Sequence, residues 1–229
     1  MNIQLSPRLQ RIADYVTPGS RVLDVGTDHA YIPIWLLQTG RCVDAIASDI
    51  RPGPLHNAEK DAEKYGVASR LELRLCDGLS GCCPEDADTV IIAGMGGETI
   101  VGILEAAPWV WDKHLILQPQ TKQPELRDWL RARGLAISDA ALSYDAGRIY
   151  LIWSVHRGSM ADYGFYDPPL LTRREPLLKP YTEDRIKRLR KQIQGVSASS
   201  RSDPALLEAL RQELEESLTI HEEVLSWQA

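Results

Sequence analysis

The stretch from Arg21 to Tyr31 constrains the fold of this chain more than any other. Val22–Val25 alternate too little between apolar and polar for a surface strand, and they predict a short strand buried on both faces. A turn containing Gly26 follows, and an apolar helical stretch then runs from Tyr31 to Leu37. A strand, a tight turn and a helix in this order present a nucleotide at the carboxyl edge of a parallel sheet.

The turn itself departs from the dinucleotide-binding fingerprint, which requires three glycines at G-x-G-x-x-G spacing. Only Gly26 is a glycine here, while Asp28 takes the next alternate position and Ala30 the one after. A carboxylate at Asp28 would repel a diphosphate, whereas a sulfonium cofactor without phosphates is compatible with it. We therefore expect the cofactor to be S-adenosylmethionine, and a nicotinamide oxidoreductase is disfavoured.

Strands alternate with helices over residues 1–157, which predicts one α/β domain with a parallel doubly wound sheet. The further expected strands are Val43–Ser48, Leu71–Leu75, Thr89–Ala93 and His114–Leu117, followed by a terminal hairpin of Leu135–Leu142 and Ile149–Val155. The expected helices are Pro7–Ala13 with Ser6 as its cap, Pro52–Tyr65, Glu98–Glu105 and Gln123–Arg133. A Rossmann-like sheet that ends in a hairpin resembles the class I methyltransferase fold.

Residues 158–229 follow a different pattern, which predicts a linker and a C-terminal antiparallel two-helix coiled coil. The apolar residues at helical spacing are Ile186, Leu189, Ile193 and Val196 in one segment, and Leu207, Leu210, Leu214 and Leu218 in the other. From Arg173 to Gln194 there are eight Lys/Arg against three Asp/Glu, a local +5. From Asp203 to Glu223 there is one Arg against seven Asp/Glu, a local −6. We expect the two arms to attract each other.

Composition limits the classes of protein that this chain resembles. The formal net charge of −6 argues against a surface that is basic throughout. No run approaches the roughly 20 apolar residues of a membrane span, and the N-terminal segment lacks a signal-peptide core. The four cysteines are expected as free thiols, and none has zinc-ligand spacing. We expect a cytoplasmic monomer with neither a metal nor a membrane partner.

Acidic side chains follow three successive predicted strands, and together they indicate a cofactor site. Asp24 lies at the first strand, where capping the turn is the alternative role. Asp49 ends the second strand, where a carboxylate accepts hydrogen bonds from ribose hydroxyls, with a helix cap as the alternative. Asp77 follows the third, where methyltransferases contact the adenine amino group. The expected cofactor-binding residues are Asp24, Gly26, Thr27, Asp28, Asp49, Ile50, Asp77, Gly78, Gly94 and Met95.

A glycine-rich turn, Gly94–Gly97, follows the fourth predicted strand, in the position of the catalytic loop of base methyltransferases. Glycines there allow the backbone to approach a planar base closely, although a simple tight turn is the alternative. A structural role is the alternative for His29, and packing is the alternative for Tyr31. The candidate catalytic residues are Asp28, His29, Tyr31, Gly94, Met95, Gly96 and Gln120.

Three motifs together resemble the bacterial tRNA adenine-N1 methyltransferases that modify adenine 22 of tRNA: Asp24–Tyr31, Ala93–Gly97 and Leu117–Gln120. The resemblance extends over nearly the whole chain, but the last motif usually ends in Asn where this chain has Gln120. It implies methyl transfer from S-adenosylmethionine to adenine N1 and a tail that binds tRNA. Because alkylation leaves a cationic base, we expect the Asp28 carboxylate to accept the N6 hydrogens and to stabilise that charge. The candidate tRNA-binding residues are Arg8, Arg173, Arg174, Lys187, Arg188, Arg190 and Lys191.

Two other functions are compatible with the same residues. The chain could methylate a small molecule or a protein through the same cofactor site. It could instead be a non-enzymatic cofactor-binding module that docks partners through its coiled coil. Incubation with labelled S-adenosylmethionine and unmodified tRNA would separate these possibilities from tRNA methylation.

Overall fold

The computed structural model describes residues 2–198 and 203–227 of the chain. The chain divides into two compact units, Met1–Met160 and Ala161–Ala229, and each is described by itself. Within the described ranges, no helix is both long and apolar enough to cross a lipid bilayer.

The first unit is built on a seven-stranded sheet with strand order β3-β2-β1-β4-β5-β7-β6. The strands are β1 (Ser20–Val25), β2 (Cys42–Asp49), β3 (Leu71–Leu75), β4 (Thr89–Gly96), β5 (His114–Thr121), β6 (Leu135–Asp145) and β7 (Arg148–Arg157). The first five strands pair in parallel, whereas β7 pairs antiparallel with both β5 and β6. Because parallel strands share one carboxyl edge, the turns that leave β1, β2, β3, β4 and β5 meet there.

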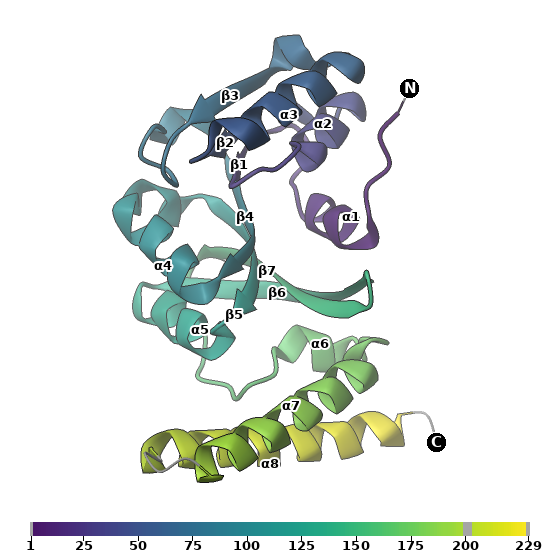
Figure 1. Cartoon of the computed structure of the whole chain (residues 1–229), viewed down its shortest axis with the longest axis vertical. Helices are drawn as coiled ribbons and strands as arrows, with labels where there is room; N and C mark the ends of the chain where they lie inside the picture. The colour runs from purple at the N-terminus through teal and green to yellow at the C-terminus, as the bar shows by residue number, and fades with distance from the viewer. Residues whose placement is uncertain (1, 199–202, 228–229) are drawn as a thin grey trace. The chain divides into compact units, whose positions relative to one another are not determined.

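Five α-helices belong to the described part of the first unit. They are α1 (Pro7–Asp14), α2 (Tyr31–Gln38), α3 (Pro52–Lys64), α4 (Gly97–Ala106) and α5 (Gln123–Ala132). Three short 3-10 helices also occur: η1 (Ala68–Arg70), η2 (Pro84–Asp86) and η3 (Pro108–Asp112). Figure 1 shows α4 and α5 on the other side of the sheet from α1 and α2.

The hydrophobic core explains why these segments form helices and strands. One cluster joins Ile12 of α1, Ile34 of α2 and Ala58 of α3 to strand residues such as Val22 and Ile91, all of them fully buried. β1 is buried along nearly its whole length, as its apolar sequence predicts. The core thus fixes β1 at the centre of the sheet, and the turn after β1 inherits that fixed position.

The strands and helices of the first unit follow one another in the expected order, and their boundaries differ mainly at β4 and β5. In the second unit, α6 lies within the segment expected to be a linker. β4 continues through the predicted glycine turn to Gly96, and β5 continues to Thr121. Their pairing continues with irregular register, with Met95 opposite Pro119 and Gly96 opposite Thr121. Ser6 does occupy the position before α1, but its hydroxyl donates to Asp145 Oδ2 at 2.6 Å and makes no cap hydrogen bond.

The second unit contains α6 (Pro168–Thr172), α7 (Leu178–Ala198) and α8 (Pro204–Ser226). Thr182 Oγ1 lies 2.8 Å from His221 Nδ1, and Arg185 forms an ion pair with Glu213. Because the earlier residue of α7 meets the later residue of α8, the two helices run antiparallel. The acidic Asp203 caps α8 by accepting hydrogen bonds from Ala205 N and Leu206 N.

The most buried residues of α8 are not the four leucines that the spacing predicts for its seam. Its fully buried residues are Glu213, Ser217 and Val224, while the four predicted seam leucines are only half-buried. Ser217 accepts a hydrogen bond of 2.9 Å from the Tyr166 hydroxyl. Polar side chains can occupy this interior because each of them finds a partner there.

Candidate functional site

The turn after β1 is held by backbone and side-chain hydrogen bonds. Gly26 N and Thr27 N both donate to Ser48 O of β2, at 2.8 and 3.0 Å, and Thr27 Oγ1 accepts from Ala30 N at 3.0 Å. Gly26 has φ +75°, and even Ala30 has a positive φ of 51°. A non-glycine residue in the left-handed region costs conformational energy, so the surrounding structure fixes this turn tightly.

Asp24 places a buried carboxyl group directly beside that turn. Its side chain is 7% exposed, and burial raises its pKa to about 6, while a hydrogen bond with Thr27 opposes the shift. A carboxylate with so little water around it is stabilised by any cation that comes close. Asp28, by contrast, has a side chain 78% exposed to solvent. The buried negative charge of the turn therefore comes from Asp24.

Asp49 and Ile50 end the neighbouring strand β2. Asp49 is buried, and its Oδ1 accepts a hydrogen bond of 2.8 Å from Arg51 N, with Arg51 Nε at 3.6 Å. In the described part of the chain, no hydrogen bond reaches the other oxygen, Oδ2. Asp49 thus orders the entry to α3 through one oxygen and can accept a ligand hydroxyl through the other. Ile50 is 61% exposed beside it, as a side chain that covers a ligand would be.

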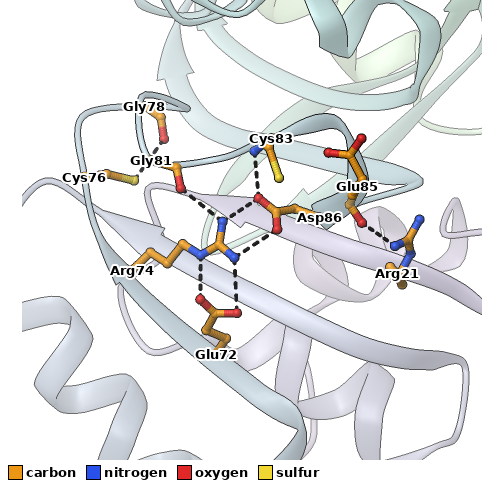
Figure 2. Close-up of polar contacts among 9 residues, drawn as sticks. All are labelled: Arg21, Glu72, Arg74, Cys76, Gly78, Gly81, Cys83, Glu85 and Asp86. Carbon is orange, nitrogen blue, oxygen red and sulfur yellow. Dashed lines mark hydrogen bonds and ion pairs between the residues drawn. The ribbon is translucent and has the colours of Figure 1, made fainter.

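The loop after β3 carries Asp77 and Gly78, and Arg74 holds it in place. Figure 2 shows the Arg74 guanidinium between Glu72 and Asp86, with two contacts to each and a third partner in Gly81 O. The hydrogen bonds from Arg74 lower the pKa of Asp86 to about 2. Asp77 is exposed, and Gly78 has φ +56°. The loop is therefore fixed at its base and open at Asp77.

His29 and Tyr31 lie together just beyond the turn. Their rings stack with centroids 4.9 Å apart, and His29 Nδ1 lies 2.8 Å from Asp61 Oδ2 of α3. On its other side, His29 Nε2 is 3.9 Å from Asp28 Oδ2. Tyr31 is 37% exposed. This arrangement gives a half-exposed aromatic pair with a carboxylate on each side.

The glycine turn of β4 faces the turn of β1. A Cβ atom added to Gly26 would lie 2.1 Å from Met95 Cε, so the methionine methyl group occupies the space that only a glycine leaves free. Gly94 has φ +77°, and a Cβ atom there would lie 3.8 Å from both Gln120 Nε2 and Arg8 Nη1. Met95 therefore lies at the cofactor turn, while Gly94 lies beside Gln120.

Several residues of this region were missed by reasoning from the sequence. Gln118 of β5 is 1% exposed and accepts a hydrogen bond from Arg8, and Asp61 holds His29. Gln118 belongs to the Leu117–Gln120 motif, so that motif held the signal. Asp61 lies within an ordinary helical pattern, and nothing in the sequence indicated its contact with His29. In the described residues, no group of three or more His, Cys, Asp or Glu side chains is placed to hold a metal ion.

The predicted cationic residues of the second unit differ in how they are engaged. Lys187, Arg190 and Lys191 are exposed and, at spacings of three and four residues, share one face of α7. Arg188 is exposed but forms an ion pair of 2.6 Å with Asp184. Arg174, which has φ 51°, stacks over Trp227 at 5.8 Å, and Arg173 is exposed.

Comparison with known proteins agrees with this geometry. Residues 5–153 match the family described as "Methyltransferase domain". The chain belongs to this methyltransferase family. A tRNA (adenine(22)-N(1))-methyltransferase of Bacillus subtilis is 35% identical over 158 residues, which cover 68% of this chain and 66% of that protein, just under two thirds of its length. The resemblance that the three motifs indicated is thereby confirmed.

Two solved structures extend the methyltransferase comparison to nearly the whole chain. The B. subtilis m1A22 tRNA methyltransferase superimposes with a TM-score of 0.78 at 27% identity, covering 98% of this chain and 99% of that one. A Streptococcus pneumoniae protein in complex with S-adenosyl-L-methionine superimposes with a TM-score of 0.74 at 31% identity, covering 92% and 100%. That Streptococcus pneumoniae protein holds S-adenosyl-L-methionine, the same cofactor that the chemistry of the turn after β1 predicts for this chain.

The residues present fit this cofactor. The buried Asp24 carboxyl suits a cationic ligand, and the available oxygen of Asp49 suits ribose hydroxyls.

Proposed function

We propose that this chain transfers a methyl group from S-adenosylmethionine to N1 of adenine 22 in tRNA. The proposal is carried by one observation: the acidic ends of β1 and β2 and the glycine turn of β4 lie at one edge of the sheet. A site for a cationic cofactor thus lies next to a turn that a planar base can approach. The resemblance to the B. subtilis enzyme supplies the substrate and the position of methylation.

The cofactor-binding residues have separate tasks in this proposal. When bound, S-adenosylmethionine supplies an electrophilic methyl group. Asp24 neutralises positive charge, Asp49 Oδ2 accepts from the ribose, and Asp77 accepts from the adenine amino group. At Gly26, Thr27 and Gly78 the backbone lies close to the cofactor. Ile50 and Met95 cover the cofactor with apolar surface.

The target base would be received by the residues on the other side of the site. Adenine N1 carries an in-plane lone pair that is unprotonated at neutral pH, so attack needs no general base. Positive charge develops on the base as the bond forms, and the Asp28 carboxylate stabilises it by accepting from the N6 amino group. Gly94, Gly96 and Gln120 position the base, and the His29–Tyr31 pair stacks with it. Extruding a stacked base costs a few kcal/mol.

We propose that the second unit binds tRNA, with α7 and α8 forming an antiparallel coiled coil. The exposed face of Lys187, Arg190 and Lys191 is the cationic surface for phosphates, and Arg173, Arg174 and Arg188 extend it. Replacing the first three by Gln should reduce the slope of log Kd for tRNA against log salt by about 2–3. Arg211→Gln, a change at an exposed cation of acidic α8, is the control and should leave that slope unchanged. We propose that the enzyme acts as a monomer in the cytoplasm.

The function is tested by incubating the protein with tritium-labelled S-adenosylmethionine and unmodified tRNA. The expected product is 1-methyladenine at position 22, located by nuclease digestion and mass spectrometry. A tRNA that carries guanine in place of adenine 22 should receive no label. Label in a small molecule or protein from added extract, with none in tRNA, would replace this function by another methyl transfer. Cofactor binding without any transfer would indicate a binding module.

A further inference from the structure

Arg8 of α1 is held by three elements of the first unit. Its Nη1 donates to Gln118 Oε1 of β5 at 3.0 Å, and its guanidinium carbon lies 5.1 Å from the ring centre of Tyr150 on β7. Its Nε is 4.0 Å from Asp145 Oδ2 of β6. The Arg8 side chain is only 25% exposed. An arginine that binds phosphates is expected to present its guanidinium to solvent, whereas the Arg8 guanidinium is largely buried and its Nη1 donates to Gln118.

The residue that Arg8 holds is itself buried beside the glycine turn. Gln118 is 1% exposed, and it lies opposite Ala93, directly before Gly94. Its Oε1 accepts from Arg8, and its Nε2 has no hydrogen-bond partner among the residues that the structure describes. Arg8 therefore sets the orientation of this amide. Without Arg8, both ends of a buried polar group would lack partners.

The same contacts reach the backbone turn at which the base is expected. A Cβ atom added to Gly94 would lie 3.8 Å from Arg8 Nη1 and 3.8 Å from Gln120 Nε2, so the guanidinium and the amide flank this turn together. Asp145, which faces Arg8, also accepts the 2.6 Å hydrogen bond from Ser6. The start of α1 is thus fastened to the β6–β7 hairpin, and Arg8 extends from that joint to Gly94.

We infer that Arg8 is a positioning residue that acts through Gln118 to fix the Gly94 turn, and that it is not a ligand for tRNA phosphates. This assignment replaces the role expected from the sequence, and it rests on the proposed methylation of tRNA. Loss of Arg8 should slow the reaction of bound tRNA and leave the electrostatic part of tRNA binding intact. A phosphate ligand would show the opposite behaviour.

The test measures kcat, the Kd for tRNA and its salt dependence for Arg8→Gln in the full-length protein. Arg11→Gln, at an exposed arginine of the same helix, is the matched control. Arg8→Gln should lower kcat at saturating tRNA about tenfold with an unchanged salt slope, and Arg11→Gln should leave kcat unchanged. Unchanged kcat for Arg8→Gln, or a salt slope reduced by about 0.7–0.9, would overturn the inference.

A double substitution tests the route through Gln118. In a Gln118→Leu background, Arg8→Gln should lower kcat by less than about twofold, because the group that Arg8 holds is already absent. Additive losses would overturn the inference. Thermal melting checks that each variant is folded at the assay temperature. If Arg8→Gln is unfolded, Arg8→Lys takes its place, and it should likewise lower kcat and leave the salt slope unchanged. Failure of the wild-type protein to label tRNA would contradict the proposed function. A labelled wild type whose Arg8→Gln variant keeps its kcat would contradict only the role of Arg8.

Discussion

The imidazole of His29, in the turn after β1, is fastened to the carboxylate of Asp61 in α3. Nδ1 and Oδ2 are 2.8 Å apart, and Asp61, with a side chain 16% exposed, is the more buried of the two. The carboxylate can only accept, so Nδ1 carries the donated proton and Nε2 points the other way, towards Asp28. The pair therefore joins the turn after β1 to α3.

Asp61→Ala should release the His29 ring and lower kcat/KM for tRNA about tenfold, because the ring is no longer held against Tyr31. The affinity for S-adenosylmethionine should change little. His29→Ala should have a similar effect, and the double variant should be no worse than either single one. Glu59→Ala, at an exposed residue of α3, is the control. Fully additive losses in this double-mutant cycle would separate the two residues functionally.

The buried carboxyl of Asp24 predicts how cofactor binding depends on pH. Its pKa is raised by burial from 3.8 to about 6, so without ligand the group is largely protonated at pH 5 and ionised at pH 7. Since a cationic ligand favours the ionised form, the affinity for S-adenosylmethionine should rise between pH 5 and pH 7. Calorimetric titrations across this range measure the effect. An affinity that does not change with pH would show that Asp24 does not contact the positive charge of the cofactor.

Asp24→Asn should have opposite effects on stability and on binding. The folded protein holds this proton more tightly than the unfolded chain, so stability from this group falls as pH rises from about 3.8 to 6. Removing the charge should therefore stabilise the ligand-free protein at pH 7.5 by about 1–3 kcal/mol. Cofactor affinity should drop at least about tenfold. Urea unfolding and calorimetry measure the two quantities, and a destabilised variant with unchanged affinity would contradict both expectations.

His114, at the start of β5, predicts a pH effect of the opposite sign. Burial and the stacked ring of His156, 4.2 Å away, lower the pKa of His114 from 6.5 to about 4. The unfolded chain takes up this proton more readily, so stability should fall as pH drops from about 6.5 to 4. His114→Gln should remove about 1–2 kcal/mol of that dependence in urea unfolding. The exposed His56→Gln should leave the profile unchanged.

Arg74 predicts a selective loss of cofactor binding. Arg74→Met removes the contacts to Glu72, Asp86 and Gly81 that fix the loop carrying Asp77 (Figure 2). The KM for S-adenosylmethionine should rise about five- to tenfold while kcat stays within about twofold, because the loop must be ordered on binding. Arg21→Met, at a half-buried arginine that contacts the other end of this loop, should have little effect. Equal changes for both variants would indicate that Arg74 has no special role.

The fold was predictable from the sequence because its signals are local. The apolar run Val22–Val25 and Gly26 indicate a buried strand and its turn within a few residues of each other. The acidic residue after each of the next two strands could be placed at the same edge once the strands were known to be parallel. The extended pairing of β4 with β5 was missed, because a glycine-rich segment reads as a turn even where Met95 and Gly96 continue a strand.

The rest of the site depends on contacts between distant segments. Ser6 reads as a helix cap, yet its partner Asp145 lies 139 residues further along the chain. Gln118 and Arg8 are 110 residues apart. In α8, spacing alone favoured the leucines, whereas Glu213 and Ser217 are buried because Arg185 and Tyr166 happen to face them. The spacing of apolar residues along one segment does not show which polar residue of another segment faces it.

The polar contacts between α7 and α8 fix the position of one helix along the other. A helix pair held only by leucines can slide by one turn with little penalty, but a shift here would separate Thr182 from His221 and Arg185 from Glu213 at once. The two helices are therefore locked lengthwise. The cationic side chains Lys187, Arg190 and Lys191 on α7 therefore keep fixed distances from the residues of α8.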